Sequence, residues 1–117
     1  MSRILLCDDA RFMRHVLAGI LTKAGNTIVG EVGNGVEAID MYKSLRPDVV
    51  FMDITMPEMD GVSAVRGIMA EDSNAKIIMC SAMGQRDMVV DALKSGAKDF
   101  IVKPFEPDRV FEALSKI

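Results

Sequence analysis

Hydrophobic residues along the chain form two kinds of segment, short continuous runs and longer stretches with helical spacing. Three of the runs, at 3–7, 48–53 and 76–80, are apolar apart from their ends, which is typical of strands covered on both faces. A run at 27–32 includes a glycine and a glutamate, a composition that suits the edge of a sheet. With a fifth run at 98–102, the pattern predicts five strands.

Helices are predicted in the intervals between these strands. Gly25 is placed to end a first helix at residue 24, and Gly96 to end a later one that covers 86–95. The first helix, over 11–24, has one apolar side made of two series spaced by four residues: Phe12, Val16, Ile20 and Met13, Leu17, Leu21.

Three more helices follow from caps and spacing. Asn34 and Glu37 have the spacing of a capping box, in which Asn34 accepts from the amide of Glu37 and Glu37 reaches back. Pro107 is placed near the first turn of the last helix. Apolar spacing marks the third and last helices: Val62, Val65, Ile68, Met69 and Val110, Phe111, Leu114, Ile117. Strands that alternate with helices predict an α/β fold with a doubly wound, five-stranded parallel sheet.

Charged and polar residues follow the predicted strands. Asp8 and Asp9 come after the first strand, Asp53 ends the third, Ser81 follows the fourth and Lys103 follows the fifth. In open parallel sheets the functional crevice lies beyond the carboxyl ends of the strands. We therefore expect three carboxylates, a hydroxyl and an ammonium group to meet at one edge.

This combination of groups indicates phosphoryl transfer. Three carboxylates at close range repel one another, and Mg²⁺, which prefers oxygen ligands, is the natural compensating cation. One carboxylate, Asp53, is then placed to act as a nucleophile toward phosphorus. Lys103 would pair with a phosphoryl oxygen, and Ser81 would donate a hydrogen bond to another. We predict that Asp53 is the phosphoacceptor.

Each of these residues has an ordinary interpretation when it is taken alone. Asp8 or Asp9 could cap the first helix, Ser81 could cap another, and Lys103 could be a surface lysine. Only their joint occurrence, each at its own strand end, supports the functional interpretation.

Composition restricts the function further. The 117 residues fit one domain that spans 1–117 without an output domain, and the net charge of −3 is spread without blocks, which argues against nucleic-acid binding. The N-terminus lacks the pattern of a signal peptide, and no apolar run approaches the length of a membrane span. We expect a cytoplasmic protein that does not insert into membranes.

Sulfur-containing and histidine residues give no sign of a second site. Cys7 and Cys80 each end an apolar run and are interpreted as buried thiols in a reducing compartment. The ten methionines are scattered, which favours core filling over metal binding, and His15 stands alone on a predicted helix surface.

Four segments, taken in order, resemble a two-component response-regulator receiver domain over the full length of the chain. They are LLCDDA, FMDITMPEMDG, CSAM and DFIVKPF, and their details are most similar to the stand-alone chemotaxis regulators of that family. The resemblance implies a flavodoxin-like (βα)5 fold with strand order 2-1-3-4-5.

The resemblance also implies a role for individual residues. Asp53 matches the phosphorylated residue, Asp9 and Asp53 match direct Mg²⁺ ligands with the carbonyl of Thr55, and Asp8 would act through water. Ser81 and Lys103 match the residues that contact the phosphoryl group.

Three further implications concern the conformational change on phosphorylation and the residues around the site. Phe100 matches the aromatic residue that fills the space vacated by Ser81. The Lys103–Pro104 peptide bond is expected to be cis. The fourth helix, fifth strand and fifth helix would form the readout surface.

For the chemotaxis members, the resemblance implies specific partners. They are a sensor histidine kinase of the chemotaxis type (CheA-like), a flagellar motor switch protein (FliM-like) and a dedicated phosphatase. The expected protein is a monomer that catalyses its own phosphorylation and dephosphorylation and turns over no separate substrate. A single-domain receiver in a phosphorelay or another non-motility pathway is the alternative within the family.

Four positions modify this expectation. Phe100 stands where many chemotaxis members have tyrosine, so no hydroxyl is available there to contact a partner. Ser81 replaces the commoner threonine. Thr55 and Met83 occupy positions that tune the phosphate lifetime in the family.

Two other protein classes compete with the receiver interpretation. A phosphatase of the haloacid-dehalogenase type usually has a second aspartate two residues after its nucleophile, where this chain has Thr55, and the chain has no cap domain. A flavodoxin-type electron carrier needs backbone donors for phosphate after the first strand, where Asp8 and Asp9 would repel it.

Overall fold

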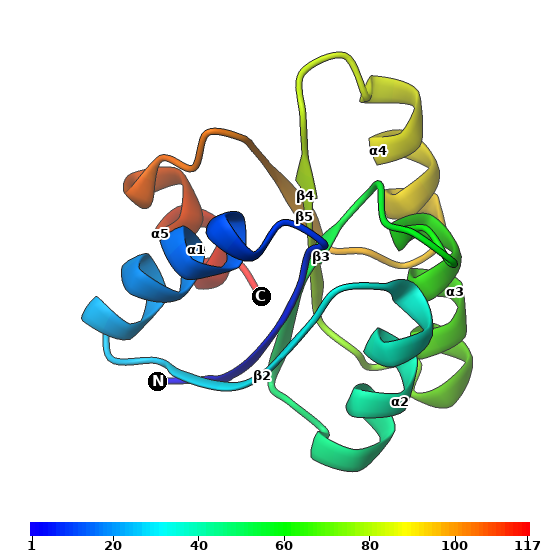
Figure 1. Cartoon of the computed structure of the whole chain (residues 1–117), viewed down its shortest axis with the longest axis horizontal. Helices are drawn as coiled ribbons and strands as arrows, with labels where there is room; N and C mark the ends of the chain where they lie inside the picture. The colour runs from blue at the N-terminus through cyan, green and yellow to red at the C-terminus, as the bar shows by residue number, and fades with distance from the viewer.

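The computed structural model describes residues 1–117, in which five strands and five helices alternate along the chain (Figure 1). The strands are β1 (Arg3–Cys7), β2 (Thr27–Val32), β3 (Val49–Asp53), β4 (Ile77–Ser81) and β5 (Asp99–Val102). The helices are α1 (Arg11–Lys23), α2 (Gly35–Leu45), α3 (Gly61–Glu71), α4 (Arg86–Lys94) and α5 (Pro107–Ser115).

The strands form one parallel sheet in the order β2-β1-β3-β4-β5, which confirms the predicted fold. Figure 1 shows α1 and α5 on one side of the sheet and α2, α3 and α4 on the other. Because every strand runs in the same direction, all five carboxyl ends lie at one edge, where the loops to the following helices begin.

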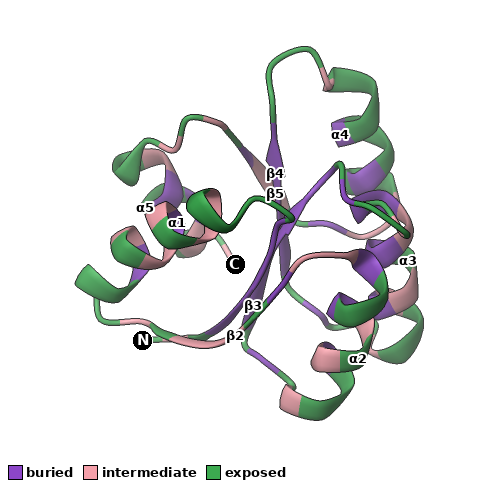
Figure 2. Cartoon of the chain, viewed as in Figure 1, coloured by how far each residue is buried: buried purple, intermediate pink, exposed green.

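Each face of the sheet has its own hydrophobic core. Alternate residues of β1 divide between them, since Ile4 and Leu6 pack with α1 and α5 while Leu5 and Cys7 pack with α2, α3 and α4. Figure 2 shows the result as buried central strands between helices whose outer surfaces are exposed. The double covering explains why the central strands are apolar along their whole length.

Most predicted element boundaries agree with the structure to within one residue. β1 and β2 match fully, and β2 lies at the sheet edge as its composition indicated. Gly25 and Gly96 have φ angles of 91° and 126°, the left-handed conformation that follows a helix end. None of the helices combines the length and the apolar character needed to cross a membrane.

One predicted helix cap is confirmed and one predicted helix end was wrong. Asn34 caps α2 by accepting from the amide of Glu37, and the Glu37 carboxylate reaches back to accept from the amide of Gly33 at 3.4 Å. α5 ends at Ser115, so Ile117 lies beyond the helix, where it still packs against the core. The chain turns out of the last helix before its final apolar residue.

Candidate functional site

Three carboxylates meet where β1 and β3 end. Asp8 and Asp9 follow β1, and Asp53 is the last residue of β3, which pairs directly with β1. One oxygen of each carboxylate lies within 4.8 Å of an oxygen of the others. Asp8 and Asp53 are buried, each 6% exposed, whereas Asp9 is open to solvent. Together the three form an acidic cluster with one accessible side.

One cation faces this acidic cluster. The ammonium group of Lys103, just beyond β5, lies 2.7 Å from Asp8 Oδ2 and 3.3 Å from Asp53 Oδ1. The following peptide bond, Lys103–Pro104, is cis, as expected. Three carboxylates are therefore matched by a single ammonium group, and the cluster keeps an excess of negative charge.

The excess charge alters the protonation of Asp53. Burial, and next the charge of Asp8, raise the pKa of Asp53 from 3.8 to about 6, although Lys103 and the Ile54 amide oppose the rise. For Lys103, burial works against the charged form, but the hydrogen bond to Asp8 and the charge of Asp53 outweigh it and raise its pKa. The carboxylates of Asp8 and Asp53 thus repel each other, and a second cation beside Lys103 would relieve this repulsion.

The loop after Asp53 folds back tightly over the end of β3. The Gly61 amide donates to the carbonyl of Ile54 at 2.7 Å, and a Cβ atom at Gly61 would lie 1.9 Å from the carbonyl oxygen of Asp53. Only glycine fits there. Asp60 caps α3 by accepting from the Ser63 amide at 2.8 Å. The Asp60–Gly61 pair therefore closes the loop that fixes Asp53.

A hydrogen-bonded bridge links this loop to the loop after β4. The Gln85 side chain accepts from the Ala82 amide at 2.8 Å and donates to the Thr55 hydroxyl at 2.9 Å. Ser81, the last residue of β4, is buried, and its hydroxyl makes no hydrogen bond. The hydroxyl is thus free to donate to a group that arrives at the sheet edge. Sequence reasoning missed Gln85, because its reach depends on the relative position of two loops.

A cavity of about 430 Å³ connects Ser81 with Phe100. The partly buried Phe100 ring lines this cavity from β5 and lies 5.8 Å from the guanidinium carbon of Arg109. The other apolar side chains of the lining come from α4, the loop before it and the end of β5: Ala82, Met83, Val89, Val90, Leu93 and Val102. The space gives an aromatic side chain room to change position next to Ser81.

The structure brings most of the predicted site residues together. The carboxylates of Asp8, Asp9 and Asp53 lie within 4.8 Å of one another, and Lys103 pairs with Asp8 and Asp53. Ser81 ends the strand beside β3. Asp8, which the resemblance links to Mg²⁺ through water, pairs with Lys103 in this structure. The donors suit Mg²⁺, because carboxylates and carbonyls are its preferred protein ligands and the cluster carries uncompensated charge.

Comparisons with known proteins agree with this geometry. The profile of the response regulator receiver domain matches residues 4–115. The chain is 62% identical over 116 residues to the chemotaxis protein CheY of Thermotoga maritima, a match that covers 99% of this chain and 97% of the relative. It is 58% identical over 114 residues to CheY of Bacillus subtilis, with 97% and 95% covered. The similarity to chemotaxis regulators expected from the motifs is confirmed.

Solved structures give the same result. A CheX–CheY complex with BeF3 and Mg²⁺ from Borrelia burgdorferi superposes with a TM-score of 0.93 at 40% identity, covering 97% of this chain and 87% of that one. The response regulator domain of Thermotoga maritima CheB superposes with a TM-score of 0.85 at 35% identity, with 97% and 91% covered. By sequence, fold and the arrangement of its strand-end residues, the chain belongs to the response regulator receiver family.

Proposed function

We propose that this chain is a stand-alone chemotaxis response regulator that takes a phosphoryl group from a histidine kinase onto Asp53 and then binds the flagellar motor switch. The observation that carries the proposal is the position of Asp53, a buried carboxylate at a strand end between Asp8 and Lys103. The high identity to proteins named CheY supports the assignment to chemotaxis.

Phosphorylation on Asp53 is a displacement at phosphorus. A carboxylate oxygen of Asp53 forms the new O–P bond while the bond from phosphorus to the donor's nitrogen or oxygen breaks, and the leaving group keeps the electron pair. With a pKa of about 6, Asp53 is ionised in most molecules at neutral pH and is more basic than an ordinary aspartate. Burial thus strengthens the nucleophile without blocking it.

The neighbouring residues stabilise the transferred group. The Lys103 ammonium, already 3.3 Å from Asp53, would pair with a phosphoryl oxygen, and the unbonded Ser81 hydroxyl would donate to another. Asp9, Asp53 and the Thr55 carbonyl would hold Mg²⁺ directly, with Asp8 through water, and the ion would neutralise charge on the phosphoryl oxygens. The protein thus catalyses its own modification and turns over no separate substrate.

The response to phosphorylation would begin at Ser81. If its hydroxyl moves toward the phosphoryl group, Phe100 can turn inward through the cavity that both residues line. The surface beside this cavity exposes apolar side chains of α4, the loop before it and β5: Met83, Val90, Leu93 and Val102. An apolar surface next to a movable aromatic residue suits a partner segment that distinguishes the two states.

The remaining parts of the proposal concern the cellular setting. We infer a cytoplasmic monomer that interacts with a chemotaxis-type kinase and a dedicated phosphatase and does not bind nucleic acid. The complex of CheX with a BeF3-loaded CheY supports control by a second protein at this fold. A net charge of −3 gives no electrostatic attraction to nucleic acid.

A phosphorelay or another non-motility pathway is the second candidate. One observation favours this second candidate. The chain is also 52% identical over 117 residues to a Bacillus subtilis protein named CcdB, and this relative is not named as a chemotaxis protein. Binding of the beryllofluoride-loaded chain to a motor switch protein, compared with phosphoryl transfer to a histidine phosphotransfer domain, would separate the two pathways.

The chemistry is tested by intact mass spectrometry after incubation with acetyl phosphate. We expect one phosphoryl adduct that requires Mg²⁺ and is absent from Asp53→Asn, with Asp40→Asn, an exposed acid on α2, as the control that still forms it. An adduct that persists in Asp53→Asn would overturn the assignment. If the wild type forms no adduct, binding of beryllofluoride separates a strict need for a kinase from a wrong acceptor.

A further inference from the structure

Arg14, on the second turn of α1, connects the loop after β1 to the end of β2. Its Nε lies 3.1 Å from Glu31 Oε1, and its Nη1 donates to the backbone carbonyl of Asp8. The side chain is 17% exposed. Its guanidinium therefore holds the peptide group between Asp8 and Asp9, the two acids of the β1–α1 loop.

The other polar groups of Asp8 are also held. Its amide donates to the carbonyl of Val32 at 3.0 Å, its Oδ1 accepts from the Ala10 amide at 2.9 Å, and its Oδ2 pairs with Lys103. The Asp9 carboxylate, in contrast, makes no hydrogen bond or ion pair. The backbone that carries Asp9 is thus fixed while its carboxylate remains free for a ligand.

We propose that Arg14 is a positioning residue that orders the Asp8–Asp9 peptide and so prepares both carboxylates for a divalent cation. The inference rests on the proposed Mg²⁺ site, to which it adds a residue that does not itself contact the metal ion. Without the guanidinium, the Asp8 carbonyl loses its partner and the loop must be ordered when the cation binds. Groups that orient metal ligands in this way commonly change metal affinity by about 10–100-fold.

Charge and positioning predict opposite results for the loss of Arg14. A positive side chain near the acidic cluster repels a divalent cation, so charge alone predicts tighter binding when Arg14 is neutralised. Positioning predicts weaker binding, because the Asp8–Asp9 peptide is no longer held. Arg14→Lys keeps the charge but lacks the planar fork that reaches two acceptors, so positioning predicts weaker binding for this variant too.

The first measurement is the affinity for Mn²⁺ alone, obtained from the electron paramagnetic resonance signal of the free ion, with Mg²⁺ as a competitor. We expect about 10-fold weaker binding for Arg14→Gln and for Arg14→Lys, at a temperature where circular dichroism shows both folded. Arg11→Gln is the matched control, since Arg11 is exposed on the same helix and makes no polar contact. Arg11→Gln should bind as tightly as the wild type or slightly tighter.

The second measurement separates positioning from a general loss of function. The rate of phosphorylation by acetyl phosphate is followed against Mg²⁺ concentration. We expect the half-saturating concentration to rise in both Arg14 variants while the rate at saturating Mg²⁺ stays within about twofold of the wild type. Unchanged or tighter Mn²⁺ binding by Arg14→Gln would overturn the inference alone, whereas a wild type that binds neither ion would overturn the proposed site itself.

Discussion

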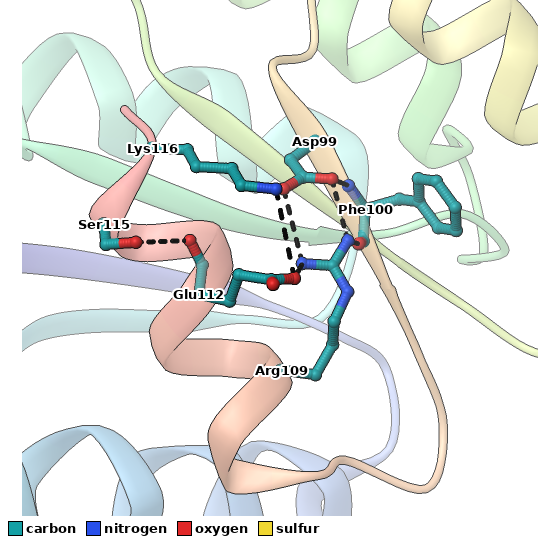
Figure 3. A network of polar contacts seen from close by, with 6 residues as sticks. All are labelled: Asp99, Phe100, Arg109, Glu112, Ser115 and Lys116. Carbon is teal, nitrogen blue, oxygen red and sulfur yellow. Dashed lines mark hydrogen bonds and ion pairs between the residues drawn. The ribbon is translucent and has the colours of Figure 1, made fainter.

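Two clusters of charged residues in this molecule use similar side chains with opposite consequences. The acidic cluster at the ends of β1 and β3 sets Asp8, Asp9 and Asp53 against one lysine. A second group, here called the α5 network, joins Asp99 of β5 to Arg109 and Glu112 of α5 and to Lys116 just beyond that helix (Figure 3). The first has three acids for one base, and the second has two of each.

The pKa values record the difference between the clusters. In the α5 network, burial works to raise the pKa of Asp99, but hydrogen bonds from Arg109, at 2.9 Å, and from the Phe100 amide outweigh it and lower the pKa. In the acidic cluster, burial and the charge of Asp8 outweigh Lys103 and raise the pKa of Asp53 to about 6. Ionised Asp99 therefore stabilises the folded state, whereas ionised Asp53 destabilises it.

This contrast indicates how a small domain can carry a reactive site. A network with equal numbers of acids and bases contributes locally to stability and has no uncompensated charge for a ligand to neutralise. An unbalanced cluster costs folding free energy, and a cation or a phosphoryl group with its metal can recover that energy on binding. The strand-end position of the acidic cluster matters because the surrounding core, and not the charges themselves, holds it in place.

The largest effect is expected from removal of the one base in the acidic cluster. Lys103→Met leaves two buried carboxylates without an opposite charge and should lower the free energy of unfolding by about 2 kcal/mol in the absence of divalent cations. Urea denaturation measures the loss, and saturating Mg²⁺ should restore part of it. Lys98→Met, at an exposed lysine whose side chain makes no polar contact, is the control. Equal stability of the two variants would show that the acids are not in conflict.

Neutralising one acid in each cluster should change stability in opposite directions. Asp53→Asn removes the charge that Asp8 repels and should raise the free energy of unfolding by about 1–2 kcal/mol when EDTA is present. Asp99→Asn weakens the pair with Arg109 and should lower it by about 1 kcal/mol. Thermal or urea unfolding of both variants measures the signs. The comparison fails if both variants are destabilised.

The pH dependence sharpens the same comparison. Above about pH 7 Asp53 is charged in both the folded and the unfolded state, so its destabilising effect is complete there. The effect shrinks as pH falls, because the folded state takes up the proton first. The gain in Asp53→Asn should therefore decline between about pH 7 and pH 4. Asp99 has a lowered pKa, so its contribution persists near pH 4 and is lost only below. Unfolding curves across this range, with EDTA, measure both trends.

Much of the acidic cluster could be predicted from sequence because parallel strands bring their carboxyl ends together. Once five parallel strands were recognised, Asp8, Asp53 and Lys103 were expected at one edge of the sheet, and the strand order implied by the family resemblance placed β1 beside β3. Arg14 and Gln85 could not be predicted in the same way, because Arg14 joins the β1–α1 loop to β2 and Gln85 joins two loops, and both contacts depend on packing. An arginine one turn into a helix that follows two acids was the only available signal for Arg14.

The α5 network was missed for a related reason. Asp99 and Arg109 lie on different elements, and their contact depends on how α5 crosses β5. Periodicity identified the apolar side of α5 but says nothing about which polar residues on its margin reach the strand. The helix end was also misplaced, since Ile117 continues the apolar spacing although the helix stops at Ser115. Spacing reports which residues are buried, and burial continues past the helix.

The smallest effect is expected at the outer margin of the α5 network. Glu112 lies 3.2 Å from Arg109 and 4.0 Å from Lys116, and its side chain is 55% exposed. Water and salt screen such contacts, so Glu112→Gln should change the free energy of unfolding by less than about 0.5 kcal/mol, and less still in 1 M NaCl. Asp99→Asn, measured beside it, should keep most of its effect in salt because Asp99 is only 16% exposed. An equal salt response of the two variants would mean that the whole network is solvated, and that burial and not pairing distinguishes the two clusters.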